Sequence, residues 1–81
     1  MGTKNDPGRF DCHTDAGPDE PIFTLRASDP EAPEAVRHWC KVRRWEIRQG
    51  RAPESDYAKV SEAMECARAM EAWYAANKGG R

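Results

Sequence analysis

The stretch from Pro33 to Arg51 constrains the fold most, because winding it as a helix separates an apolar arc from a line of positive charges. At about 100° per residue the apolar arc spans roughly 160°, the width of a helix face that packs on a core. We therefore predict that this arc is buried. It consists of Ala32, Ala35, Val36, Trp39, Cys40, Val42 and Ile47.

A basic ridge follows the far side of the same helix. Its residues are spaced four, three, four and three apart, which places them within about 80° of one another. The basic ridge consists of Arg37, Lys41, Arg44, Arg48 and Arg51. Trp45 also falls outside the apolar arc, beside His38, and we expect it to be an exposed aromatic anchor next to the ridge.

Turn-forming residues bound this first helix. Asp29 fits the N-cap position, but Pro33 would then remove one backbone hydrogen bond, so a tight turn over residues 29–32 is an equally good start. Gly50, followed by Pro53, ends the helix and opens a loop of about five residues. A loop this short favours an antiparallel helix as the next element.

A second helix is expected from Ser55 or Asp56 to about Asn77, with Gly79 and Gly80 ending it. It carries a continuous apolar face that can pack on the arc of the first helix. The two helices therefore form a predicted hairpin. The apolar face of the second helix consists of Tyr57, Val60, Ala63, Met64, Ala67, Met70 and Tyr74.

Charged residues interrupt both apolar faces. Arg43 and Glu46 lie in the arc of the first helix, and Glu71 lies in that of the second. Long side chains at such positions can carry their charges out to water. The alternative is an ion pair between Arg43 and Glu71, which would set the register of the helices more than it stabilises them.

The residues before the helices are of two kinds. Residues 1–20 are polar and contain several Gly and Pro, with Phe10 as the only large hydrophobe, which predicts a flexible arm. Residues 21–27 alternate in polarity, which predicts one short, half-buried β-strand. The predicted fold is mainly α: a flexible arm over residues 1–20, then a single small helical domain over residues 21–81, in which the strand precedes an antiparallel two-helix hairpin.

The length of the chain limits its core. A domain of 81 residues buries only about 60% of the surface that its unfolded chain exposes. Such a domain cannot hide three tryptophans well, so we expect either a homodimer or a sizeable exposed apolar patch that binds a partner.

The cellular compartment is also predicted by composition. No apolar run approaches the roughly 18 residues of a membrane span, and the N-terminal residues lack the apolar centre of a secretory signal. The three cysteines are an odd number and are scattered along the chain. This pattern argues against a disulfide framework and agrees with a reducing compartment, so we expect a cytosolic protein that does not contact a membrane.

Metal binding and catalysis are both disfavoured. Cys12, His13, His38, Cys40 and Cys66 offer the ligand types that zinc prefers, but no Cys-x-x-Cys pair is present. His38 and Cys40 would also point about 160° apart on a helix. A chain this short has little room for a closed pocket. We therefore predict no metal, no cofactor and no enzymatic activity.

The basic ridge has three interpretations: a solvated surface, contact with nucleic-acid phosphates, or docking on an acidic protein surface. The net charge of −1 and the acidic second helix weigh against nucleic acid, because a helix-turn-helix protein presents its second helix to DNA. A protein partner is therefore favoured, and nucleic acid is the weaker alternative. The predicted partner-binding residues are Arg37, His38, Lys41, Arg44, Trp45, Arg48 and Arg51.

Two segments, Pro21–Trp39 and Ala63–Trp73, resemble a group of small, mostly uncharacterised proteins encoded by phages and prophages. The stretch that contains both segments, from Pro21 to Trp73, makes up about two thirds of the chain. It is carried by Phe23, Leu25, Arg26, Asp29, Ala32, Pro33, Val36, Arg37 and Trp39, and by Ala69, Met70, Glu71 and Trp73. The chain departs from the group in its basic inter-helix region, Val42–Tyr57, and in its N-terminal arm.

The resemblance implies a non-catalytic inhibitor from a mobile element, and anti-CRISPR proteins are the class of that kind that this chain looks most like. Such a protein would bind a subunit of a CRISPR effector complex in the cytoplasm of a bacterial host. It would block the effector by steric occlusion. The alternatives are a dimeric phage accessory or regulatory adaptor, and a small nucleic-acid-binding protein that uses the basic helix face.

Overall fold

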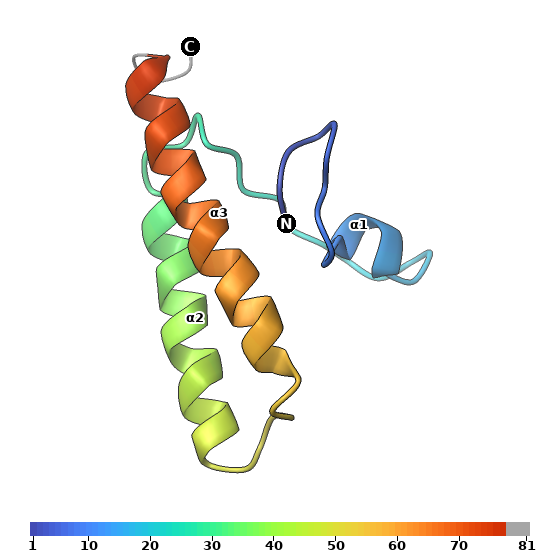
Figure 1. Ribbon diagram of the computed structural model, residues 1–81. Coiled ribbons are helices and arrows are strands. Elements are labelled where there is room, and N and C mark those ends of the chain that lie inside the picture. The colour runs from blue at the N-terminus through green and yellow to red at the C-terminus, as the bar shows by residue number, and fades with distance from the viewer. Residues whose placement is uncertain (78–81) are drawn as a thin grey trace.

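The computed structural model describes residues 1–77 and is mainly helical within that range, as predicted. Its helices are α1 (Cys12–Asp15), α2 (Ala32–Arg48) and α3 (Asp56–Ala76). The two long helices, α2 and α3, lie side by side, run in opposite directions and are joined by residues 49–55 (Figure 1). Gly79 and Gly80, which were expected to end α3, lie outside the described residues.

The predicted β-strand over residues 21–27 is wrong. No strand occurs within residues 1–77, and residues 21–26 have no regular secondary structure. The side chain of Phe23 is 84% exposed, although the alternation of polarity predicted that it would be half-buried. A single strand needs a neighbour for its N–H and C=O groups, and alternating polarity alone does not supply one.

A turn leads into α2, which confirms the second of the two predicted starts. The carbonyl of Asp29 accepts a hydrogen bond from the Ala32 N–H at 3.0 Å, and its carboxylate accepts one from the Glu31 N–H at 2.9 Å. Pro33 then lies in the first turn of the helix, where its missing N–H has no intrahelical partner to lose.

The end of α2 is a Schellman motif centred on Gly50, which has a φ of +76°. The Gly50 N–H donates to the carbonyl of Ile47 at 3.0 Å, and the Arg51 N–H donates to the carbonyl of Glu46 at 2.9 Å. These bonds satisfy carbonyls that the helix leaves free, and the left-handed backbone at Gly50 turns the chain toward α3. The predicted role of Gly50 is confirmed.

The contact between α2 and α3 is built from small side chains. Cys40, Val60 and Ala63 form its buried centre, and the half-buried Trp39 and Met64 pack against them. Because these side chains are short, the largest aromatic groups lie at the rim of the contact or outside it. The buried apolar residues are Ala32, Cys40, Ile47, Val60, Ala63 and Ala67.

The buried side of α2 differs in direction from the predicted apolar arc. Ala35 and Val42, which were expected in the core, are exposed, whereas Arg37 and Arg44 of the basic ridge are half-buried. α3 is the only described helix that packs on α2, and it covers one side of it. That side centres on Cys40 and is turned away from Ala35 and Val42.

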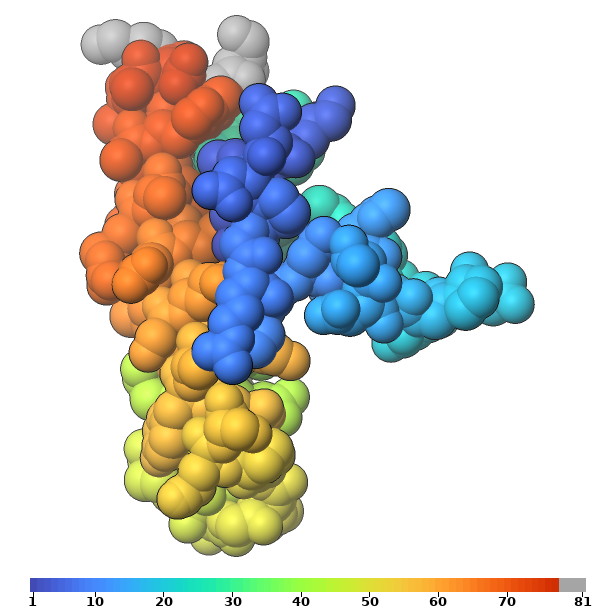
Figure 2. All heavy atoms as spheres, turned by 45° about the vertical axis from the view of Figure 1, so that its right-hand side comes forward, coloured from blue at the N-terminus to red at the C-terminus, as the bar shows by residue number. Residues whose placement is uncertain are grey.

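The first part of the N-terminal arm, before α1, lies against α3, whereas α1 and the residues that follow it project away from the hairpin (Figure 2). The N–H groups of Arg9 and Phe10 each donate to the carboxylate of Glu62 at 3.0 Å, and the ammonium group of Met1 lies 3.1 Å from the same carboxylate. The ring of Phe10 also lies near the ammonium group of Lys59, 5.7 Å from the ring centre. The flexibility of residues 1–20 stays a prediction.

Candidate protein-binding face

The side of α2 opposite α3 is exposed and combines apolar, aromatic and basic groups. Val42 and Trp45 at its centre are each 45% exposed. We call this side the outer face of α2, and besides the acidic Glu34 it consists of Ala35, His38, Lys41, Val42, Trp45 and Arg48. Four of these residues were predicted to bind a partner, whereas Ala35 and Val42 were missed because the apolar arc assigned them to the core.

One end of the basic ridge is held by an internal ion pair. The guanidinium group of Arg37 donates two hydrogen bonds to the carboxylate of Glu71 on α3, at 2.9 and 2.6 Å. Glu34 lies 3.6 Å away on the other side of the same guanidinium. The hydrogen bonds from Arg37 lower the pKa of Glu71. Arg37 therefore joins the two helices, and its charge is largely neutralised within the chain.

Arg51, at the other end of the ridge, is also engaged. Its Nε donates to the carboxylate of Glu46 at 3.0 Å, and its guanidinium carbon lies 4.4 Å from the centre of the Trp45 ring. This cation–π contact covers part of the indole and helps to hold it in place on the surface. The sequence pattern placed Arg51 with the free cations, but the structure makes it a support for Trp45.

The middle of the ridge carries the available positive charge. Lys41 and Arg48 are exposed and Arg44 is half-buried. Among residues 1–77, none of these three side chains forms an ion pair. Together with the exposed imidazole of His38 and the indole of Trp45, they form a surface that can accept carboxylate or phosphate groups beside an apolar group.

The ion pair between Arg43 and Glu71, one of the two explanations offered for these charges, is not formed. Arg43 lies 3.3 Å from the carboxylate of Asp56 instead, and Glu71 pairs with Arg37. In an antiparallel hairpin, moving toward the end of one helix means moving toward the start of the other. Cys40 contacts Val60, so residues after Cys40 on α2 lie opposite residues before Val60 on α3. Arg43 therefore faces the beginning of α3, and at 1.5 Å per residue Glu71 lies about 20 Å further along the helix.

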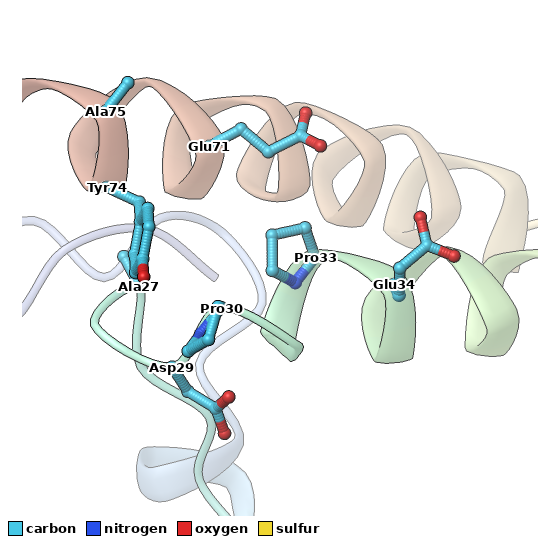
Figure 3. A pocket seen from close by; sticks show the side chains of 8 residues that line it. All are labelled: Ala27, Asp29, Pro30, Pro33, Glu34, Glu71, Tyr74 and Ala75. Atoms are coloured by element: carbon cyan, nitrogen blue, oxygen red, sulfur yellow. The ribbon is translucent and has the colours of Figure 1, made fainter. Parts of the chain in front are cut away.

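A shallow hollow of about 180 Å³ lies at the other end of the hairpin, away from Trp45 (Figure 3). Tyr74 extends from α3 toward Ala27 on one side of it. The hollow is smaller than the usual range for a small-molecule site, which begins at about 300 Å³. It is lined by Ala27, Asp29, Pro30, Pro33, Glu34, Glu71, Tyr74 and Ala75.

Residues 1–77 hold no group of three or more His, Cys, Asp or Glu side chains placed to bind a metal ion. Cys40 is buried beside Val60, where burial raises the pKa of its thiol, and Cys12 is exposed on α1. None of the described helices is long and apolar enough to cross a membrane.

The fold and the outer face of α2 define a small helical hairpin with one basic surface that carries an aromatic group. Comparisons of the chain with protein-family models, with curated proteins and with solved structures find no match.

Proposed function

We propose that this chain is a non-catalytic protein that binds an acidic surface of a partner protein through the outer face of α2. The observation that carries the proposal is the group of cations Lys41, Arg44 and Arg48, which form no ion pair among residues 1–77, beside the half-exposed Trp45. Aromatic and arginine side chains dominate the binding energy of protein interfaces, and complementary charge around them guides association.

The internal ion pairs favour a protein partner over nucleic acid. Arg37 and Arg51, two of the five ridge cations, are occupied by Glu71 and Glu46. Sequence-independent binding to nucleic acid needs many phosphate contacts, and each lost cation weakens it. A protein surface with a few carboxylates around an apolar hollow matches three cations and one indole more closely.

The resemblance to phage and prophage proteins extends the proposal to a specific class of partner. The chain would act as an anti-CRISPR protein that occupies a CRISPR effector subunit in a bacterial host and blocks it by steric occlusion. Of the residues that carry the resemblance, Arg37 and Glu71 join the two helices, so that part of the resemblance concerns the hairpin itself. Trp45 and Arg48 belong to the segment where the chain departs from the group, which suits a surface adapted to one target.

The test uses the full chain as bait in lysates from bacteria that express a CRISPR system, together with a plaquing assay in the same cells. We expect the chain to capture an effector complex and to restore phage growth. Lys41→Glu with Arg48→Glu should abolish both effects. The matched control is Arg68→Glu, which reverses an exposed charge on α3 and should leave both effects unchanged.

Other results would contradict parts of the proposal. If no effector is captured and plaquing does not change, the anti-CRISPR assignment is wrong. If capture survives the double charge reversal, the outer face of α2 is not the binding surface. DNA affinity that falls steeply with salt and is lost in the double variant would favour the nucleic-acid alternative. A dimeric accessory adaptor would capture a phage or host protein other than an effector.

A further inference from the structure

Three exposed apolar side chains of α2 and the imidazole of His38 have the spacing of a helix-packing surface. Ala35, His38, Val42 and Trp45 follow one another at intervals of three, four and three residues. This is the spacing at which side chains of one helix meet a second helix along a seam. Since α3 packs on the opposite side of α2, the seam has no partner among the described residues.

The seam is complementary in size to a second copy of itself. If a second copy is placed antiparallel, with the two-fold axis between His38 and Val42, Ala35 of each copy faces Trp45 of the other. His38 of each copy then faces Val42 of the other. The smallest side chain of the seam thus meets the largest, and symmetry repeats the match on both sides of the axis.

The charges beside the seam support the same register. Glu34 lies on one flank of the seam, and its side chain is 83% exposed. Arg48 lies on the same flank, about two helical turns beyond the two-fold axis. In the antiparallel arrangement, Glu34 of one copy faces Arg48 of the other, and this pair forms twice. Lys41 lies near the two-fold axis, so Lys41 of one copy faces Lys41 of the other. The repulsion between these two ammonium groups is unfavourable in this register.

We propose that two copies of this chain associate through the outer face of α2, antiparallel, with Trp45 of each copy packed against Ala35 of the other. One face of a single helix buries less than the roughly 1,200 Å² of a standard interface, so the dimer is weak, with a dissociation constant on the order of 100 μM. Because the same face is proposed to bind the partner protein, dimer formation and partner binding exclude each other.

Sedimentation equilibrium of the full chain, from about 10 μM to 1 mM, tests the dimer over its expected range. We expect the mass to rise from monomer to dimer. Glu34→Arg or Arg48→Glu alone should weaken the dimer at least about tenfold, and the two together should restore it because the charges are exchanged. Lys41→Gln should strengthen the dimer, and Arg68→Glu on α3 should not change it. Far-UV circular dichroism checks that each variant is folded.

A monomeric mass up to about 1 mM would overturn the proposal. A dimer whose dissociation constant does not change with the Glu34 and Arg48 substitutions would also overturn it. A dimer that is lost with Trp73→Glu but kept with Trp45→Glu would place the interface on α3. The dimer does not depend on the proposed function. A chain that dimerises but captures no effector loses only the proposed function, and a chain that captures an effector but stays monomeric loses only the dimer.

Discussion

Replacing Val60 by alanine tests the core of the hairpin quantitatively. Val60 is 3% exposed and contacts Cys40 and Ala63. Removing its two extra carbons costs about 1.6 kcal/mol at about 0.8 kcal/mol per buried carbon. The remaining cavity adds about 1 kcal/mol, and the higher helix propensity of alanine returns about 0.5 kcal/mol. We expect Val60→Ala to lower the free energy of unfolding by about 2 kcal/mol.

Val42→Ala is the matched control, because it removes the same atoms from the neighbouring helix at a position that is 45% exposed. The lost burial is about half as large, and the gain in helix propensity offsets most of it, so the change should stay within about 0.5 kcal/mol. Both variants are measured by urea and thermal denaturation, followed by circular dichroism. A protein concentration of about 10 μM keeps the chain monomeric.

In a domain of this size, 2 kcal/mol corresponds to a fall in melting temperature of about 8 to 16 °C. Val60→Ala should show such a fall, and Val42→Ala should change the melting temperature by less than about 4 °C. Equal losses for the two variants, or a larger loss for Val42→Ala, would refute the orientation of α2. That result would mean that the apolar arc faces α3, and the outer face of α2 would not exist as described.

Three further predictions test the termini and ion pairs of the hairpin. Gly50→Ala should lower the free energy of unfolding by about 1 kcal/mol in urea denaturation. A Cβ at Gly50 would meet no neighbouring atom, so the cost comes from the left-handed backbone alone. Gly17→Ala, at a position without a left-handed backbone, should have little effect. Arg43→Glu should destabilise the hairpin, and a double-mutant cycle should show rescue by Asp56→Arg but not by Glu71→Arg. The pKa of Glu71 is lowered in the folded chain, so its stabilising effect is present above the ordinary pKa of a glutamate and is lost as the pH falls through the lowered value. Urea midpoints between about pH 6 and pH 2 should show this loss in the wild type, and Glu71→Gln should remove that part of the pH dependence.

Local signals in the sequence predicted the boundaries of α2 and the beginning of α3 well, whereas the short helix α1 was not predicted. Gly50 was expected to end α2 because glycine adopts the left-handed conformation without a steric cost, and the structure places it at φ +76°. Pro33 raised a turn over residues 29–32 as an equally good alternative to an Asp29 cap, and the structure shows the turn. Such signals are readable because they depend on one residue and its immediate neighbours.

Non-local features were predicted less well. The strand over residues 21–27 failed because a strand depends on a neighbour that the alternation of side chains cannot reveal. The partner of Arg43 was wrong because pairing across a hairpin depends on where the two helices align, and apolar periodicity leaves that alignment free. Of the candidate site, Trp45 was placed correctly outside the buried arc, whereas Val42 was assigned to the core because a wheel of one helix does not show which part its neighbour covers.

The size of the buried side chains explains why so much apolar surface lies outside this hairpin. Cys40, Val60 and Ala63 occupy its centre, and a close contact between helices with such short side chains leaves no space for an indole. Trp45 and Trp73 therefore remain on the surface, 45% and 44% exposed. No third described helix packs on the hairpin to cover them. Within residues 1–77 these groups stay uncovered, so the outer face of α2 is open to a molecule that brings acidic groups to the cations beside Trp45. An acidic partner and a second copy that brings Glu34 to Arg48 are two solutions to the same requirement.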